Sequence, residues 1–267
     1  MNKAGGAIRE LHLLDGLANQ DSFLHRIHPA VKILVTLFYI LMLVSFDKYN
    51  LTGTLGMILV PMLLMELGGL PAKVILRQLR FLLGLLFLVG IANPWFDRTV
   101  MVQWGSVKLT GGMISCMTLY LKGGFALTAS YILIASTGME NICYGLQTLH
   151  MPRVLITVIT LIYRYLILFL KEVNQTMLAY SLRAPGQKGI HIRAWGSLAG
   201  AMLLRSMDRS ELVYQSMLLR GFRGTFRLAG KRKAGRGGDM GYLTGMVLVI
   251  TVLRVCPVFE IVGKCIR

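Results

Sequence analysis

Six apolar runs that approach or reach the length of a membrane span constrain this fold more than any other feature of the sequence. They lie at residues 31–46, 51–67, 81–92, 113–136, 154–170 and 241–259. A helix needs about 20 apolar residues to cross a hydrocarbon core, and tilt or flanking residues compensate for shorter runs. Because 55% of the residues are hydrophobic and the mean hydropathy is +0.61, we expect an all-α integral membrane protein.

The positive charge of the chain indicates which parts lie in the cytoplasm. The sequence has 29 Lys and Arg against 12 Asp and Glu, a formal net charge of +17. In a soluble protein this excess would suggest nucleic acid, but in a membrane protein it is typical of cytoplasmic loops beside the bilayer. Of the 29 basic residues, 15 fall within residues 136–241, so we expect this block in the cytoplasm and no nucleic-acid partner.

The run at 154–170 is predicted not to cross the bilayer, although its hydropathy alone would suggest a span. Arg164 lies near its midpoint, where a charged side chain costs about 2.5–3.5 kcal/mol. A crossing here would also move the basic segment 73–80 to the outside. We therefore predict about five transmembrane helices, four before this run and one after it. A long apolar helix over 152–183 is expected to be buried against protein near the cytoplasmic face.

This topology divides the chain into five parts. It predicts a cytoplasmic N-terminal segment over 1–30, a four-helix membrane region over 31–136, cytoplasmic-side helices over 137–224, a solvated basic loop over 225–240, and a last span with an external C-terminus over 241–267. Two shorter features lie between the spans. Basic residues at helical spacing predict an amphipathic surface helix over 73–80, and residues 100–109 predict a short extended segment.

Two arginines each stand where a predicted helix stops. Arg183 lies in Ser181-Leu182-Arg183-Ala184, before Pro185 and Gly186, and Arg220 lies in Leu219-Arg220-Gly221. Proline cannot continue a helix and glycine commonly ends one. A cation at a helix C-terminus stabilises it by about 0.3–1 kcal/mol, which would suffice to explain either arginine alone. Because an arginine at a predicted helix end occurs again 37 residues later, we favour a docking surface with two basic helix tips.

The helix that ends at Arg220 is predicted to begin near residue 192 and to cross the helix over 152–183. It carries two pairs of small residues one turn apart, a spacing that lets helices approach closely. These pairs are Gly196 with Gly200 and Ser206 with Ser210. The prediction is therefore a cytoplasmic module of long crossed helices that presents two separated tips.

The sequence carries none of the common motifs of a catalytic or metal site. It lacks a Gly-x-x-x-x-Gly-Lys-Ser/Thr phosphate loop, a His-Glu-x-x-His helix and a Gly-x-Ser-x-Gly elbow. Its cysteines are scattered and its N-terminal histidines match no standard ligand spacing: Cys116, Cys143, Cys256, Cys265, His12, His25 and His28. We expect no catalytic residue, metal site or cofactor, which favours a mechanical role over a membrane enzyme or channel acting alone.

Two basic residues fall within predicted spans. Lys122 belongs to the run at 113–136, and Arg254 belongs to the run at 241–259. A charge at this depth needs a partner or access to the interface. Snorkelling to the interface or an interior partner is favoured for both residues over a role in transport.

Several short stretches resemble the transmembrane coupling subunit of energy-coupling factor (ECF) transporters, and most closely its cobalt-uptake branch, CbiQ. The similarity extends from about His28 to Gly224. His28-Pro29-Ala30-Val31-Lys32 resembles that family's opening Asp-Pro-Arg-x-Lys, and Leu182-Arg183-Ala184 stands where the family usually has Ala-Arg-Gly. The most specific stretches are Tyr163-Arg164-Tyr165, Lys171-Glu172, Leu204-Arg205-Ser206 and Met217-Leu218-Leu219-Arg220-Gly221-Phe222-Arg223-Gly224.

This resemblance implies a non-catalytic subunit of an importer in a bacterial or archaeal plasma membrane. In the family, two coupling helices insert their arginines into grooves on a pair of cytoplasmic, CbiO-like ATPases. The apolar flanks of those helices hold a substrate-binding membrane subunit, which is CbiM-like and accompanied in some systems by a CbiN-like subunit. The resemblance assigns ATPase coupling to Arg183 and Arg220 with their neighbours Ser181, Leu182, Ala184, Leu219 and Gly221. Cobalt is the expected substrate, with nickel or a vitamin as alternatives.

Overall fold

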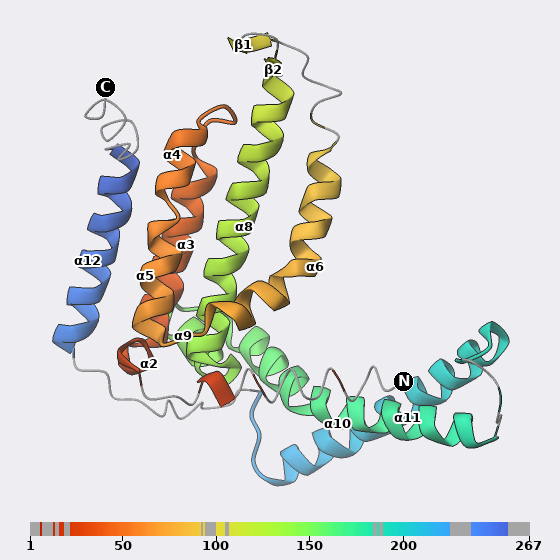
Figure 1. Cartoon of the computed structure of the whole chain (residues 1–267). Coiled ribbons are helices and arrows are strands. Elements are labelled where there is room, and N and C mark those ends of the chain that lie inside the picture. Colours follow the sequence, from red (N-terminus) through yellow and green to blue (C-terminus); the bar gives the residue numbers. More distant parts are fainter. Residues whose placement is uncertain are drawn as a thin grey trace. The chain divides into compact units, whose positions relative to one another are not determined.

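The computed structural model describes residues 6, 13, 16–18, 22–91, 93, 100–104, 107–183, 186, 189–224 and 236–255. The predictions for Ala184, for most of segment 1–30 and of the loop 225–240, and for residues 256–267 lie outside these ranges. The chain divides into two compact units. We call residues 17–145 with 230–267 the membrane unit, and residues 1–16 with 146–229 the paired-helix unit (Figure 1).

The membrane unit is organised around one long helix. Helix α8 (Gly111–Thr137) contacts α2 (Phe23–Arg26), α3 (Pro29–Val44), α4 (Leu51–Gly56), α5 (Leu59–Gly68) and α6 (Ala72–Gly90), and α12 (Arg236–Val255) packs on α3 and α4. Helix α9 (Met139–Thr148) follows α8 after Gly138, whose φ is +74°. The core between the helices holds the fully buried side chains of Tyr39, Leu43, Met57, Val60, Ala129 and Ile250.

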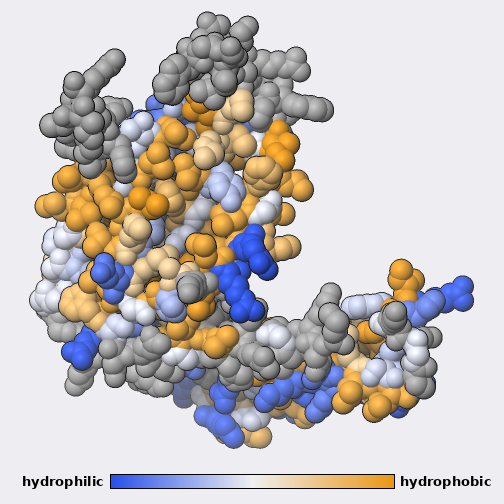
Figure 2. All heavy atoms as spheres, in the orientation of Figure 1, coloured by the Kyte–Doolittle hydropathy of each residue, from blue (hydrophilic) through white to orange (hydrophobic). Residues whose placement is uncertain are grey.

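The helices of the membrane unit match the predicted spans. Segments 51–68, 111–137 and 237–255 are long and apolar enough to cross a bilayer, and Pro29–Val44 and Leu79–Gly90 are shorter apolar helices. Hydrophobic side chains cover much of the surface of this unit (Figure 2). The all-α membrane fold is thus confirmed. The amphipathic helix expected over 73–80 leads into the following apolar run, and both form the single helix α6, Ala72–Gly90.

A short hairpin precedes α8. Strand β1 (Val100–Trp104) pairs antiparallel with β2 (Val107–Thr110), with Gln103 opposite Lys108 and an irregularity between Val100 and Val102. The extended segment expected over residues 100–109 is therefore confirmed. The hairpin adds two strands to a unit whose packing is otherwise helix on helix.

Glycines allow helices of the membrane unit to approach closely at two points. A Cβ added to Gly145 in α9 would lie 2.9 Å from the Ala30 backbone nitrogen and 3.0 Å from the Pro29 carbonyl carbon. One added to Gly123 in α8 would lie 2.6 Å from Leu86 of α6. At Gly145 the neighbour is backbone and cannot rotate away, so α9 is seated directly on the first turn of α3.

The paired-helix unit consists of α10 (Arg153–Arg183, 31 residues) and α11 (Ile192–Leu219, 28 residues). Pro152 precedes α10, and the His191 side chain caps α11 by accepting from the Arg193 N–H. Only Ile156 and Thr157 are buried in α10, and α11 has no buried residue. The expectation that residues 152–183 are buried against protein is therefore wrong within this chain, because the long apolar helix leaves most of its surface exposed.

Candidate docking site on the paired helices

The end of α11 is a specific glycine cap that leaves Arg220 at the tip. Arg220 is the C-cap residue, and Gly221 follows with φ +79°, in the left-handed region. The Gly221 N–H donates to the Leu218 carbonyl at 2.9 Å, and the Phe222 N–H donates to the Met217 carbonyl at 3.0 Å. These two bonds form a Schellman motif, which satisfies carbonyls that the helix itself leaves unpaired. The predicted helix stop is thus made by Gly221.

The end of α10 places Arg183 as its last helical residue. Two residues earlier, the Ser181 hydroxyl donates to the Leu178 carbonyl at 2.8 Å, so Ser181 is hydrogen-bonded within its own helix. Beside the two arginines stand Leu182, which is 74% exposed, and Leu219, which is 89% exposed. Each basic tip therefore carries an exposed apolar side chain next to its cation. Such a pairing suits a protein groove that has both apolar walls and carboxylates.

The two tips lie at opposite ends of the helix pair. Arg183 lines a cavity of about 650 Å³ with Tyr180 and Leu198. Arg220 lines another of about 520 Å³ with Arg164 and Tyr165. Because α11 runs back along α10, its 28 residues at about 1.5 Å each separate the tips by about 42 Å.

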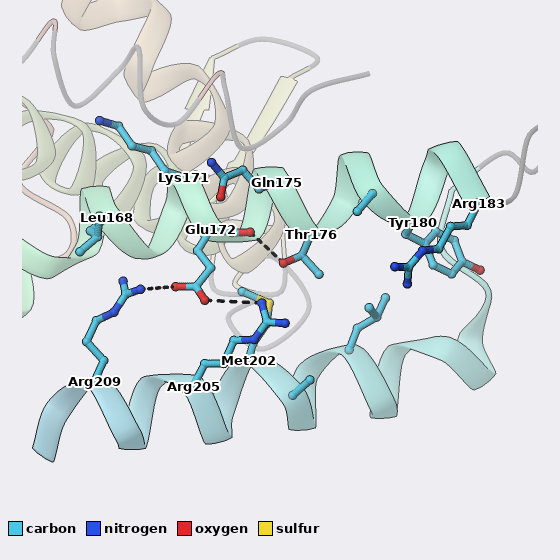
Figure 3. A pocket seen from close by; sticks show the side chains of 13 residues that line it. Leu168, Lys171, Glu172, Gln175, Thr176, Tyr180, Arg183, Met202, Arg205 and Arg209 are labelled. Atoms are coloured by element: carbon cyan, nitrogen blue, oxygen red, sulfur yellow. Dashed lines mark hydrogen bonds and ion pairs between the residues drawn. The ribbon is translucent and has the colours of Figure 1, made fainter. Parts of the chain in front are cut away.

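Glu172 joins the two helices between these tips. Its Oε2 lies 3.2 Å from Nη2 of Arg209, and its Oε1 lies 3.8 Å from Nη1 of Arg205 (Figure 3). This contact was not predicted. The sequence offered two signals for it: an acidic residue that follows the apolar run of α10, and the family resemblance of Lys171-Glu172 and Leu204-Arg205-Ser206.

The predicted close crossing through small residues is wrong for the glycine pair. A Cβ added to Gly196 or Gly200 would meet no atom within 4 Å, so neither glycine touches α10. Ser206 and Ser210 do face α10, where they line a cavity of about 390 Å³ with Phe169. Both serine hydroxyls donate to carbonyls of their own helix. The helices are thus separated by a cavity at the serine pair rather than crossing tightly there.

Lys122 and Arg254 have interior partners at the C-terminal end of α3. The Lys122 ammonium group donates to the Phe46 carbonyl. Arg254 Nη2 lies 3.0 Å from the Ser45 carbonyl oxygen, and its guanidinium carbon lies 4.0 Å from the centre of the Phe46 ring. Both cations therefore have partners within the chain, at the end of α3 that precedes the polar turn over residues 47–50.

Further polar contacts hold the opposite end of α3. The buried Lys32 ammonium group donates to the Ser136 carbonyl at 3.1 Å, and the His28 N–H donates to Asp239 at 2.9 Å. The His28 ring accepts from the Ala30 N–H, which makes it an N-cap. Among the described residues, no group of three or more His, Cys, Asp or Glu side chains could hold a metal ion. His12 lies outside that part of the chain.

Comparisons with known proteins identify relatives of the chain. The family model CbiQ, described as a cobalt transport protein, matches residues 20–230, a stretch that includes both arginine tips. An uncharacterised protein of Methanocaldococcus jannaschii is 25% identical over 139 residues. That alignment covers 51% of this chain and 47% of the relative, so the chain spans about half the length of the curated relative that it matches.

Proposed function

Because the chain belongs to the CbiQ cobalt transport protein family, we propose that it is the transmembrane coupling subunit of an ECF-type importer. As a member of this family it is a membrane component of cobalt transport. The finer proposal is that it transmits motion from cytoplasmic ATPases to a substrate-binding membrane subunit and performs no catalysis itself. The observation that carries the proposal is the pair of long, exposed helices that each end in an arginine beside an exposed leucine.

The proposed partners follow from the surface of the paired helices. A pair of CbiO-like ATPases would receive the two tips, because the planar guanidinium group binds carboxylates through two parallel hydrogen bonds and stays charged. A CbiM-like membrane subunit, with or without a CbiN-like subunit, would cover the apolar flanks. Those flanks expose large apolar side chains that such a subunit could contact, among them Leu178, Trp195, Leu203 and Leu212.

The proposed mechanism uses the separation of the tips. Each arginine is held at the end of a helix, at opposite ends of a unit about 42 Å long. When ATP closes the ATPase pair, the two grooves move relative to each other and displace the tips with them. Stiff helices convert this displacement into a tilt of whatever their flanks hold. The tilt would expose the substrate site of the partner subunit to the cytoplasm.

This mechanism requires a defined topology, which we also propose. The N-terminus and the paired-helix unit lie on the cytoplasmic side of a bacterial or archaeal plasma membrane, and the C-terminus lies outside. The support is the distribution of basic residues, of which 15 of 29 fall within residues 136–241. Helix α10 meets the length and hydropathy of a span. The proposal places it on the membrane surface instead, because Arg164 would otherwise lie near mid-membrane.

Charge reversal of both tips tests the proposal. In cells that express the whole transporter, Arg183→Glu combined with Arg220→Glu should abolish cobalt accumulation and co-purification of the ATPases, while membrane insertion stays normal. Arg153→Glu is the matched control, because Arg153 is an exposed arginine at the start of α10, 30 residues before Arg183 and 11 residues before Arg164, which lies beside Arg220. Normal ATPase recovery with the double variant would refute the proposal. Loss of nickel rather than cobalt accumulation on deletion of the wild-type gene would reassign the substrate.

A further inference from the structure

We propose that Glu172 is a positioning residue that fixes the offset between α10 and α11, and with it the distance between the two arginine tips. It does so by forming ion pairs with Arg205 and Arg209 at the same time. We call this three-residue contact the ionic latch. The consequence for transport rests on the proposed function. The latch itself is a property of this chain and can be tested without any partner.

The geometry of the latch resists sliding of α11 along the axis of α10. The two carboxylate oxygens of Glu172 are divided between two guanidinium groups, at 3.2 Å for Arg209 and 3.8 Å for Arg205 (Figure 3). Arg205 and Arg209 are four residues apart and therefore lie on the same face of α11, one turn from each other. A carboxylate seated between two cations resists sliding in either direction. A single ion pair would restrain α11 less firmly.

Partial burial makes the latch stronger than an ordinary surface pair. The Glu172 side chain is only 19% exposed, whereas Arg209 is 42% and Arg205 is 63% exposed. Isolated surface pairs are weak because water and salt screen them, and networks around a shielded charge are screened less. The Arg209 arm is therefore expected to contribute more than the Arg205 arm, since it is both shorter and better shielded.

The surroundings of the latch leave the offset poorly fixed by packing. A cavity of about 650 Å³ lies between the helices toward Arg183, and cavities of about 390 and 520 Å³ lie toward Arg220. Close-packed side chains would lock the two helices in register, and cavities of this size leave gaps in that packing. The contact at Glu172 lies between the gaps. It is therefore placed to set the register of the pair.

The surrounding positive charge explains why a neutral side chain in place of Glu172 could not hold the two helices together. Glu172 is the only acidic residue of α10, and the cavities on either side of it are lined by Arg164, Lys171, Arg183 and Arg220. Without the carboxylate, Arg205 and Arg209 would face these cations across the gap, and like charges repel. Loss of the negative charge should let the helices move apart or slide.

Distance measurement in the full chain alone tests the latch. The four cysteines, at 116, 143, 256 and 265, are replaced by serine, and spin labels are attached after Leu178→Cys and Leu218→Cys. Both leucines are exposed, at 60% and 49%, and they lie near opposite tips. In nanodiscs the parent chain should give one narrow distance distribution. Glu172→Gln, which keeps the shape and removes the charge, should lower the ratio of that distance to all other distances about fivefold and so broaden the distribution.

Two further variants keep the result interpretable. Glu211→Gln removes a carboxylate that contacts Gln215 of its own helix, and it should leave the distribution unchanged. Exchange of the charges, Glu172→Arg with Arg209→Glu, restores one arm and should narrow the distribution again. An unchanged distribution in Glu172→Gln, or an equal broadening in Glu211→Gln, would overturn the latch.

A second readout separates the latch from the proposed function. In the assembled transporter, Glu172→Gln should keep ATPase co-purification, because Arg183 and Arg220 are intact, while cobalt accumulation falls in proportion to the fraction of chains that keep the parent distance. Normal accumulation despite a broadened distribution would show that the offset does not matter for transport, which contradicts the positioning role. Failure of the wild-type chain to recover ATPases would instead refute the proposed function and leave the distance result standing.

Discussion

Arg254 of the last helix lies on the C-terminal end of α3, with its Nη2 atom 3.0 Å from the Ser45 carbonyl oxygen and 3.3 Å from the Ser45 hydroxyl. Lys122 of α8 donates to the next carbonyl, that of Phe46. The last carbonyls of a helix have no partner within it, and cations are stabilising there. One helix end therefore provides the partners for two cations that the apolar helices α8 and α12 carry, and it ties three helices together.

We predict that Arg254→Met and Lys122→Met each destabilise the membrane unit. Each change removes a hydrogen bond from a cation to a carbonyl of Ser45 or Phe46, at a cost of about 0.5–1.5 kcal/mol. Thermal unfolding in detergent, followed by cysteine accessibility or light scattering, measures the effect. Lys48→Met is the control, because Lys48 is exposed in the turn that follows α3. Equal melting of all three variants and the wild type would contradict the structural role.

Gly145→Val is expected to destabilise the seat of α9 on α3. The new Cβ would lie 2.9 Å from the Ala30 nitrogen, and the backbone there must shift, which typically costs about 1–3 kcal/mol. Gly84→Ala is the matched control, because a Cβ at Gly84 meets no atom within 4 Å and alanine favours a helix. The two variants are compared by thermal melting under identical conditions. Equal melting temperatures of Gly145→Val and Gly84→Ala would show that the contact between α9 and α3 is not tight.

Gly221→Val should impair the Arg220 tip without weakening the membrane unit. A Cβ at Gly221 has open space around it, so its effect is conformational: φ of +79° is strained for a β-branched residue by about 1–2 kcal/mol. The glycine cap would then rearrange and redirect Arg220. We expect reduced ATPase recovery with an unchanged melting temperature of the membrane unit. Gly221→Asn, which tolerates this conformation, should behave like the wild type, and equal recovery from both variants would argue against the cap.

The sequence was sufficient to predict the features that depend on local chemistry. Span positions follow from apolar length, and the stop of α11 follows from Gly221 because only glycine adopts its conformation readily. The tip at Arg220 could be located for the same reason, and the tip at Arg183 because Pro185 cannot continue a helix. Partners for Lys122 and Arg254 could be expected, since lipid offers a cation few alternatives. Which groups serve as partners could not be predicted.

Features that depend on the rotation of one helix against another could not be predicted. The spacing of Gly196 and Gly200 indicates a surface that another helix could approach, but it does not say which helix, and in this chain the two glycines face open space. Glu172 meets arginines 33 and 37 residues away because of how α11 turns back. The exposure of α10 was also missed, since hydropathy predicts an apolar environment without saying whether the same chain supplies it.

The most direct test of the proposed function identifies the proteins that contact the two tips in living cells. A photo-crosslinking amino acid is placed at Leu182 and, separately, at Leu219, which are exposed beside Arg183 and Arg220. We predict that irradiation of the cells joins both positions to an ATPase subunit, and that crosslinks from Leu203, which is exposed in the middle of α11, do not reach this subunit. If membrane-impermeant reagents added outside the cell label positions 182 and 219, the two tips lie outside the cell and the proposed function is contradicted.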